Sequence, residues 1–265
     1  MPATISIHSF RGGNGKSNTT ANLAAVLAAK GFRTAVIDAD IQSPGIHVIF
    51  GVDQSKLEFC PNDYLWGRCR IEQASHDVSK AAGLEQDSGL FLIPSCLRPG
   101  EIARIPREGY DVALRNDGFQ RLLKQPELDF LLIDTHPGVN EETLLSVAIS
   151  DMFIVVMRPD NQDFQGTAVT IELARKLDVE DMRLLINKVP SGTDLAALKA
   201  EAERAFGVKV AGLLELSTDV ARAASGGVFC IQRPEHPCRL NRSLQHKRQS
   251  ALLGFQTPGF VWAAR

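Results

Sequence analysis

The sequence lacks any long apolar run, and it lacks the pattern of a signal peptide. The longest apolar stretches, such as Met152–Met157, are far too short to cross a bilayer, and no basic region followed by an apolar segment of signal-peptide length stands at the N-terminus. A formal charge of -2 on 265 residues also gives no general preference for nucleic acid or for a membrane surface. We therefore expect a cytoplasmic protein in which any such partner is met by a local patch.

Cysteine is scarce and has no regular spacing. The cysteines are odd in number and none belongs to a C-x2-C pair, so the sequence predicts neither a disulfide framework nor a zinc site. We expect ordinary thiols at every position, and these positions are Cys60, Cys69, Cys96, Cys230 and Cys238.

A glycine-rich loop is the most informative segment that the chain does contain. It reads Ser-Phe-Arg-Gly-Gly-Asn-Gly-Lys-Ser from Ser9 to Ser17, between an apolar strand pattern and a helical one. Glycines allow backbone N–H groups to converge on an anion, and the following helix adds its positive dipole end. Lys16 would then reach the outer phosphates of a nucleotide, and the Ser17 hydroxyl would ligate Mg²⁺. The strict G-x4-GK[ST] motif is not met, because Phe10 occupies the position of its first glycine.

Strand-length apolar runs alternate with helical patterns along most of the chain. This alternation predicts an α/β fold with a doubly wound, mostly parallel sheet flanked by helices and with ligands at the carboxyl ends of the strands. Two stretches rich in proline, glycine and charge, 50–80 and 98–118, are expected to form loops or short helices over the sheet. The expected strands lie at 4–7, 34–37, 90–93, 130–133, 153–157 and 184–186, and the expected helices at 17–30, 141–150, 165–177 and 195–206.

Two aspartates close strands at the edge where the glycine-rich loop is expected. Asp38 follows the strand at 34–37, and Asp134 follows the strand at 130–133. A carboxylate at this place can bind Mg²⁺ through water or orient an attacking water. Either aspartate alone could instead cap a helix or stabilise a turn. His136, two residues further on, could contact a γ-phosphate or pack beside the loop.

Together these segments resemble the deviant Walker A ATPases of the MinD/ParA family. The resemblance rests on the residues at 11–17, on Asn-Thr-Thr-Ala-Asn-Leu-Ala at 18–24, on Val-Ile-Asp-Ala-Asp at 36–40 and on Leu-Ile-Asp-Thr at 132–135, and it continues to about Phe229. We expect a single P-loop ATPase domain over 1–237, followed by a basic and apolar C-terminal tail, 238–265, as a candidate flexible segment. The resemblance implies a homodimer that forms when ATP is bound, with two subunits face to face across two nucleotides.

The resemblance also implies roles for individual residues. Ser17 and, through water, Asp134 would serve Mg²⁺, with Asp38 as a further candidate for the metal. Asp38 would position or activate the hydrolytic water, with Lys16 and Arg11 as the other catalytic candidates. The nucleotide-binding residues implied in the loop and at the start of the helix are Gly12, Gly13, Asn14, Gly15, Lys16, Ser17 and Asn18.

Arg11 departs from the family pattern, in which a signature lysine reaches into the partner subunit. Arginine keeps the charge but is longer and presents a planar fork of donors, so the exchange is not conservative at a closely fitted phosphate site. One hypothesis is that Arg11 acts in trans on the partner's nucleotide, as an arginine finger does. The other is that Arg11 forms a local salt bridge and that the dimer trigger is weakened.

Adenine recognition, in the same resemblance, would come from Asn187 and from the loop around Leu214–Ser217. This loop lacks the proline that relatives often have there. Asn187 and Lys188 also match the start of the motif with which many GTPases read guanine, but Val189 and Pro190 follow where that motif needs an acidic residue. ATP with Mg²⁺ is therefore the expected ligand.

The tail is a candidate for contact with a surface. It carries basic residues interleaved with apolar ones and has no acidic residue after Glu235, although it has no clean amphipathic helix. Such a segment could touch anionic lipid or DNA phosphate, or it could be a disordered end without a partner. The polar residues at 160–167 are expected to cap a helix, with a role at the dimer face left open.

These features predict a slow, partner-stimulated ATPase that acts as a dimerisation switch. It would position a chromosome, a division component or another cargo on a nucleoid or membrane surface, with an unidentified activating protein as a further partner. The alternative is a nucleotide-gated regulator with little or no hydrolysis, although Asp38 and Ser17 favour hydrolysis. An ATPase of the nitrogenase-iron-protein type would need paired cysteines at the dimer face to hold a cluster, which Cys60, Cys69 and Cys96 do not resemble.

Overall fold

The structure of the chain, a computed structural model, describes residues 1–41, 43–96, 98, 100, 112–125, 127–223 and 225–236. Its strands are β1 (Ala3–His8), β2 (Thr34–Asp38), β3 (His76–Asp77), β4 (Leu90–Ile93), β5 (Phe130–Asp134), β6 (Met152–Met157), β7 (Asp181–Val189) and β8 (Lys209–Glu215). Its helices are α1 (Lys16–Ala29), α2 (Ile46–Ile49), α3 (Pro61–Leu65), α5 (Val112–Leu123), α6 (Glu141–Ala148), α7 (Asn161–Lys176), α8 (Leu195–Phe206), α9 (Thr218–Ala223) and α10 (Phe229–Gln232), with 3-10 turns at Gln54–Lys56 and Ile71–Ala74.

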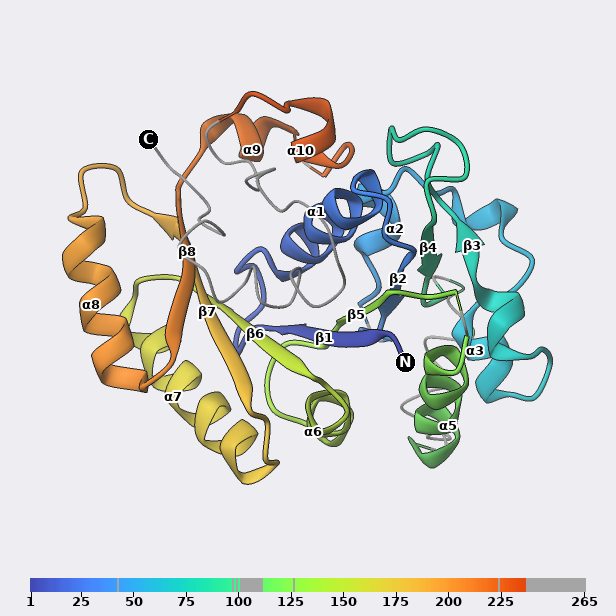
Figure 1. Cartoon of the computed structure of the whole chain (residues 1–265), viewed down its shortest axis with the longest axis horizontal. Coiled ribbons are helices and arrows are strands. Elements are labelled where there is room, and N and C mark those ends of the chain that lie inside the picture. The colour runs from blue at the N-terminus through green and yellow to red at the C-terminus, as the bar shows by residue number, and fades with distance from the viewer. Residues whose placement is uncertain are drawn as a thin grey trace.

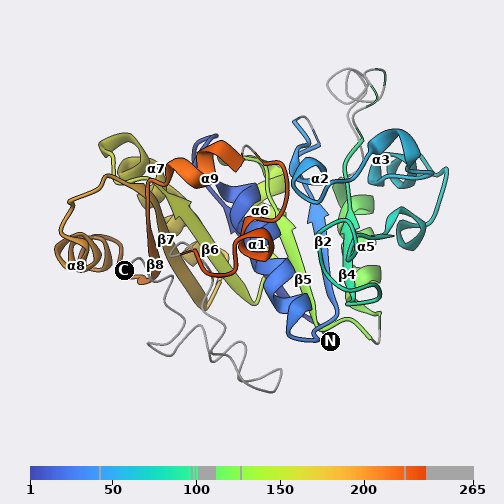
Figure 2. The ribbon, with the colours of Figure 1, turned by 90° about the horizontal axis from the view of Figure 1, so that it is seen from above.

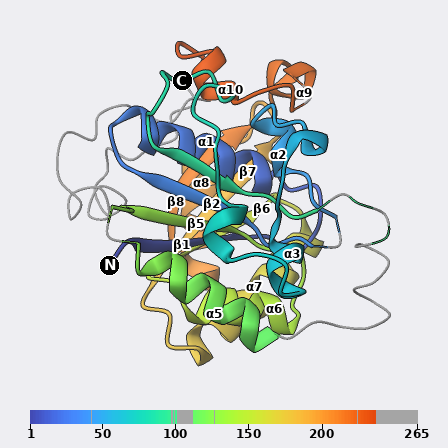
Figure 3. The same cartoon turned by 90° about the vertical axis from the view of Figure 1, so that its right-hand side faces the viewer.

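The strands form one sheet in the order β3-β4-β2-β5-β1-β6-β7-β8 (Figure 1). Every neighbouring pair is parallel except β3 with β4, which is antiparallel. Helices α1, α2 and α10 lie on one side of the sheet, whereas α5, α6 and α7 lie on the other (Figure 3). Seen from above, α1 runs along the middle of the sheet with α10 against it (Figure 2). The doubly wound, mostly parallel α/β fold expected from the sequence is confirmed.

Alternation along the central strands divides the core between the two faces of the sheet. Val36 and Leu132 pack into the core on the α1 side, whereas Ile37 and Ile133 pack into the core that includes α3 and α5. Because strand side chains alternate between faces, the same period continues to the last residue of each strand. Asp38 therefore follows Val36 onto the α1 side, and Asp134 follows Leu132.

Strand register brings these two carboxylates together. β2 and β5 are neighbours, and Asp38 is paired directly with Asp134 in their ladder. The connection from β1 to α1 emerges at the same edge, because β1 is the next strand after β5. The expectation that both aspartates lie at equivalent strand ends beside the glycine-rich loop is confirmed.

β8 and α5 are the longest of the elements that were not expected from the sequence. β8 is a seven-residue edge strand with alternating burial, and Leu214 and Glu215 at its end were predicted as part of a loop. α5 is a twelve-residue helix that runs through a stretch expected to hold loops or short helices. Gly118 has a packing reason within it, because a Cβ there would lie 2.7 Å from Cε1 of Tyr64. Helix α5 can therefore approach the Tyr64 ring closely only with glycine at this position.

The prediction of ordinary thiols was wrong for two of the cysteines. Cys60 and Cys96 form a disulfide, with their Cα atoms 5.8 Å apart and a sequence separation of 36. Cys60 immediately precedes α3 and Cys96 follows β4, so only the packing of α3 beside the end of β4 brings them together. Cys69 and Cys230 are free thiols, as expected. Cys238, like the rest of the tail at 238–265, lies outside the described residues.

Phe10 has a packing role that explains its place in the loop. Its ring lies against the backbone of α7 at Gly166, where a Cβ atom would overlap the ring. The bulky residue at the first position of the motif thus anchors the loop to a neighbouring helix.

Gly166→Ala is expected to destabilise the protein. Overpacking costs about 1–3 kcal/mol, which exceeds the gain in helix propensity of up to about 1 kcal/mol. Urea unfolding of wild type, Gly166→Ala, Phe10→Ala and the double variant would measure both effects. The loss should vanish in the Phe10→Ala background, and a Gly166→Ala variant as stable as wild type would contradict this packing.

Candidate functional site

The glycine-rich loop between β1 and α1 forms an open cradle. Gly13 and Gly15 have φ angles of 81° and 93°, which side-chain-bearing residues rarely adopt. Gly15 is the N-cap of α1 and has no side chain that could cap the helix. The first N–H groups of this fourteen-residue helix are thus available to an anion at its positive end.

A buried ion pair lies behind this cradle. The Lys16 Nζ donates to Asp134 Oδ1 over 2.9 Å, and the Thr20 hydroxyl donates to the same oxygen over 3.1 Å. Lys16 is 7% exposed and Asp134 is 1% exposed. Breaking such a buried pair without replacing either partner is strongly destabilising, so each charge needs its partner or a substitute of the same sign.

Asp38 lies beside this pair and is also buried. Its Oδ1 accepts the backbone N–H of Asp40 over 3.1 Å, and its Oδ2 accepts that of Gly45 over 3.3 Å. Burial, followed by the nearby charge of Asp134, raises the pKa of Asp38 well above its usual range, while Lys16 opposes the shift. The raised pKa makes the Asp38 carboxylate a stronger base than an exposed aspartate.

His8 completes the buried group at the end of β1. Burial and the charge of Lys16 lower its pKa to about 3, so the ring is neutral at physiological pH. His8 Nδ1 lies 2.8 Å from the Thr135 hydroxyl, which donates to the Ile7 carbonyl over 3.0 Å. The neutral ring therefore helps to hold the backbone that follows Asp134.

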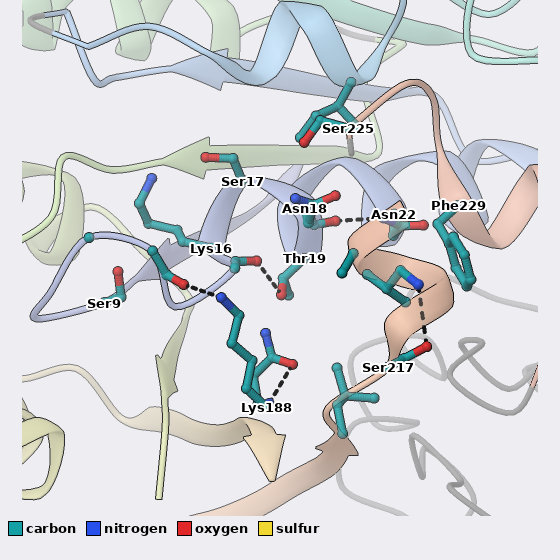
Figure 4. Close-up of a pocket in the computed structure, with 18 of the residues that line it drawn as sticks. Ser9, Lys16, Ser17, Asn18, Thr19, Asn22, Lys188, Ser217, Ser225 and Phe229 are labelled. Atoms are coloured by element: carbon teal, nitrogen blue, oxygen red, sulfur yellow. Dashed lines mark hydrogen bonds between the residues drawn. The ribbon is translucent and has the colours of Figure 1, made fainter. Parts of the chain in front are cut away.

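The cradle opens into a cleft of about 570 Å³. One wall comes from the loop and the first turn of α1, and the facing wall comes from the end of β8, α9 and α10 (Figure 4). Leu214, Leu216 and Phe229 make the far end apolar, while Lys16 and Ser17 make the near end polar. A cleft with a polar anion-binding end and an apolar end suits a nucleotide.

The end of β7 holds the loop from the other side. Asn187 Nδ2 donates to the Asn14 carbonyl over 2.7 Å. Lys188 Nζ donates to the Gly13 carbonyl, also over 2.7 Å (Figure 4). Lys188 adopts a φ of 57°, which turns its side chain back over the loop. The Asn187 side chain fills the space that a Cβ at Gly15 would need. The loop is therefore held between β7 and α1, the helix that follows it.

Arg11 faces α7 rather than the cleft. Its Nη1 donates to Oε1 of Gln162, in the first turn of that helix. Asp160 caps the same turn by accepting the N–H groups of Gln162 and Asp163, so the expected capping role is confirmed there. Arg11 thus has a local, uncharged partner within its own chain.

Most of the predicted nucleotide-binding residues line one cleft. Asn14 is an exception, because it does not line the cleft. Its side chain is buried and donates to the Val156 carbonyl, so Asn14 contributes to the loop only through its backbone. Neither Asp38 nor Asp134 is among the lining residues; both lie behind Lys16. His136 is near Asp40, with Nε2 3.8 Å from a carboxylate oxygen. The predicted residues that do line the cleft are Gly12, Gly13, Gly15, Lys16, Ser17, Asn18 and Asn187.

Sequence reasoning did not single out several other residues of the site. Thr20 contacts the buried carboxylate, and its position four residues after Lys16 on α1 is the signal that could have identified it. The hydrogen bond from Lys188 to the Gly13 carbonyl depends on a left-handed backbone conformation of Lys188 that no sequence pattern indicated. Phe229 reaches the cleft only through the packing of α10 on α1.

Comparison with known proteins identifies the fold and its relatives. The model of the CobQ/CobB/MinD/ParA nucleotide-binding domain matches residues 5–228. An ATP-binding protein of Methanocaldococcus jannaschii is 27% identical over 89% of this chain and 83% of its own length. The septum site-determining protein MinD of Bacillus subtilis is 28% identical over 71% of this chain and 66% of its own. The structure of MinD from Pyrococcus horikoshii, complexed with Mg-ADP, superposes with a TM-score of 0.71 at 20% identity, covering 89% of this chain and 90% of that one.

Asp38→Asn is expected to change how stability depends on pH. Because the folded-state pKa of Asp38 is raised, its stabilising contribution is fully present below the unfolded-state pKa and is lost as pH rises through the folded-state value. The variant cannot ionise there, so its unfolding free energy relative to wild type should rise from pH 5 to pH 8. Urea unfolding of the nucleotide-free proteins measures this difference.

Asp117→Asn, on the exposed face of α5, is the matched control for the loss of one surface carboxylate. A constant difference between Asp38→Asn and wild type over this pH range would contradict the raised pKa.

Proposed function

Because this chain belongs to the CobQ/CobB/MinD/ParA nucleotide-binding family, we propose that it binds ATP and hydrolyses it slowly as a dimerisation switch. The observation that carries the proposal is the buried Lys16–Asp134 ion pair, which lies behind an anion-binding loop and beside Asp38. Lysine, carboxylates and a glycine cradle at one strand edge form the set of groups that phosphoryl transfer requires.

Phosphate binding begins with an exchange of partners at Lys16. The outer phosphates of ATP take the place of Asp134 as acceptors for the Lys16 Nζ. The backbone N–H groups of Gly12, Gly13 and Gly15 and the start of α1 hold the remaining phosphate oxygens, with Asn14 contributing through its backbone. Asn18, on the first turn of α1, lines the same end of the cleft. The exchange preserves a negative partner for Lys16 throughout, so no buried charge is left alone.

The same exchange frees Asp134 for a metal ion. Carboxylate, hydroxyl and water oxygens are the ligands that Mg²⁺ prefers, and Asp134, Ser17 and Asp38 supply such oxygens next to the phosphate end. We assign Mg²⁺ to Ser17 directly and to Asp134 through water, with Asp38 as the more distant candidate. When bound, Mg²⁺ would neutralise charge on the β- and γ-phosphates.

Hydrolysis depends on Asp38. Its carboxylate orients the attacking water toward the γ-phosphate, and its raised pKa brings it closer to the operating pH, which favours a general base. The backbone N–H groups of Asp40 and Gly45 hold the carboxylate, so its orientation depends on both hydrogen bonds. We therefore expect a slow intrinsic rate that an activating partner increases.

The adenine ring of ATP occupies the apolar end of the cleft. Asn187 and the loop at Leu214–Ser217 are assigned to adenine, and Phe229 and Leu216 add apolar surface. Asn187 must share its side chain between this role and its hydrogen bond to the Asn14 carbonyl.

Arg11 is the proposed trigger of the dimer. Its present partner, Gln162, is neutral, so the guanidinium can leave it at lower cost than it could leave a carboxylate. In an ATP-bound homodimer Arg11 reaches the nucleotide of the other subunit and stabilises negative charge on the phosphoryl group. This is the trans hypothesis; the observed contact with Gln162 is local but is not a salt bridge.

The dimer would act on a surface. We propose residues 1–237 as one ATPase domain, with a nucleoid or anionic membrane as the surface and a chromosome, division component or other cargo as the object positioned. No helix within the described residues is both long and apolar enough to span a membrane. The tail proposed to contact DNA or lipid lies outside those residues.

The switch is tested by light scattering and phosphate release on one set of proteins. Wild type should be monomeric with ADP and dimeric with ATP, and Asp38→Ala should dimerise with ATP but release phosphate at least roughly a hundredfold more slowly. A wild-type protein that stays monomeric in every condition would overturn the switch. An ATP-dependent dimer without phosphate release, with or without DNA or liposomes, would instead identify a nucleotide-gated regulator.

Arg11→Ala and Arg121→Ala complete the set. Arg121 is an exposed arginine on α5, away from the cleft, and controls for the loss of a surface charge. Arg11→Ala should lose the ATP-dependent dimer while still binding ATP, whereas Arg121→Ala should behave as wild type. If Arg11→Ala dimerises and hydrolyses ATP as well as wild type, the trans role is wrong.

A further inference from the structure

The disulfide between Cys60 and Cys96 lies next to the carboxylate edge of the sheet. Both cysteines are 3% exposed, and their Cα separation of 5.8 Å is typical of a disulfide. Cys96 comes after Pro94 and Ser95, at the carboxyl end of β4, which is the strand beside β2 and therefore beside Asp38. The site is thus one strand away from the residue to which we assign water activation.

The surroundings suit a dithiol pair better than a metal ion. Sγ of each cysteine and a carboxylate oxygen of Asp63 lie within 4.8 Å of one another. The Asp63 carboxylate is already engaged, because Arg98 Nη2 and the Cys60 N–H donate to Oδ2 over 3.0 and 3.1 Å, and Arg68 Nη1 donates to Oδ1 over 3.1 Å. The two guanidinium charges repel a cation from this carboxylate, so the two sulfurs lie next to each other rather than around a metal ion.

Hydrogen bonds connect the disulfide to Asp38. The Ser95 hydroxyl donates to the Asp38 carbonyl over 2.7 Å, and Gln54 Nε2 donates to the Ser95 carbonyl over 2.7 Å. The Cys96 N–H donates to Oδ1 of Asn62, on α3, over 3.1 Å. The disulfide and this hydrogen bond together hold α3 to the segment that supports the end of β2.

The packing beside this connection leaves little room. A void of only about 10 Å³ lies among Asp38, Pro61, Ser95 and their neighbours, which is at the lower limit for one water. A disulfide holds its sulfurs about 2 Å apart, whereas two thiols need at least roughly 3.5 Å, the separation of non-bonded atoms. In a close-packed interior this extra distance must move α3 or the Ser95 segment.

We propose that Cys60 and Cys96 form a reversible redox site that controls the support of Asp38. The closed disulfide holds Ser95 against the Asp38 carbonyl, and reduction loosens that contact and slows ATP hydrolysis. The effect on hydrolysis rests on the function proposed above; the redox site itself does not.

The oxidant and reductant are small-molecule disulfides and thiols. One cysteine thiolate attacks a small-molecule disulfide, which forms a mixed disulfide and releases one thiolate. The second cysteine thiolate then attacks the cysteine sulfur of the mixed disulfide and releases the other. Two protein thiols lose two electrons and two protons, and one small disulfide becomes two thiols. Reduction is the reverse exchange.

Cys69 serves as the internal control. It is a free, half-buried cysteine in the same part of the fold, and burial together with Asp63 raises the pKa of its thiol. A protonated thiol is a poor nucleophile, so Cys69 should not take part in the exchange. Cys69→Ser therefore preserves the redox response, whereas Cys60→Ser and Cys96→Ser abolish it.

The first experiment maps the disulfide in the full-length native protein. The probes are oxidised glutathione for closure and excess dithiothreitol for opening, without denaturant, followed by alkylation and peptide mass mapping. The Cys60–Cys96 linkage should appear after oxidation and disappear after reduction in wild type and in Cys69→Ser. Failure of the linkage to form, or failure of dithiothreitol to open it, would overturn the redox site whatever the protein does with ATP.

The second experiment tests the connection to Asp38 by two independent readouts. Reduction should slow phosphate release by roughly tenfold, because small displacements of catalytic groups have effects of this size or larger, while ATP affinity stays unchanged. Hydrogen exchange at the N–H groups of Asp40 and Gly45, which donate to Asp38, should accelerate on reduction even if hydrolysis is absent. Exchange and hydrolysis that do not respond to reduction would overturn the control of Asp38. A protein without ATPase activity whose exchange responds would refute the proposed hydrolysis and leave the redox control standing.

Discussion

The structure of the site depends on one buried ion pair, between Lys16 and Asp134. Two opposite charges can share this position only because each neutralises the other, and removing one would leave the other stranded in a nearly dry environment. The Thr20 hydroxyl and the neutral ring of His8 surround the pair without adding charge. In the function that we propose, an incoming triphosphate would replace Asp134 as the partner of Lys16, and a metal ion would replace Lys16 as the partner of Asp134. The ion pair thus places one cationic and one anionic group at the position of the proposed metal–nucleotide complex.

The ion pair in turn depends on strand geometry. Alternation along β5 places Asp134 on the same face as Leu132, and the register with β2 places Asp38 directly beside it. A shift of either strand by one residue would move its carboxylate to the opposite face of the sheet, away from α1. The apolar cores on both faces fix this register, so the hydrophobic residues of the strands determine the electrostatics of the site.

This dependence explains how much of the site could be predicted from the sequence. Asp38 and Asp134 were predictable because each ends a continuous apolar run, and Lys16 was predictable because its motif is local. β8 was not, because an edge strand with alternating burial and a glycine at position 212 resembles a loop. Nor could spacing reveal the Cys60–Cys96 pair, since the two positions have a sequence separation of 36 and only the docking of α3 brings them together. Such features arise from tertiary packing, which no local pattern records.

The loop itself is held from two directions, and this arrangement bears on Arg11. Phe10 packs on α7 at Gly166 and Arg11 bonds to Gln162 of the same helix, while Lys188 reaches the loop from β7. Arg11, for which we propose a role in the partner subunit, is thus held against α7 of its own chain. A phosphate charge in a second subunit would be a stronger acceptor than Gln162, because hydrogen bonds to charged groups are roughly twice as strong as neutral ones.

The central claim is that Asp134 exchanges Lys16 for a metal ion when the nucleotide binds. Calorimetric titration of ATP into wild type and Asp134→Asn, with Mg²⁺ and with a chelator, tests it most directly. Without Mg²⁺ the variant should bind ATP at least as tightly as wild type, because Lys16 no longer has to leave a carboxylate. Mg²⁺ should strengthen binding to wild type, and the variant should lose this gain by roughly 10–100-fold. An Asp134→Asn variant with the same Mg²⁺ dependence as wild type would contradict the account.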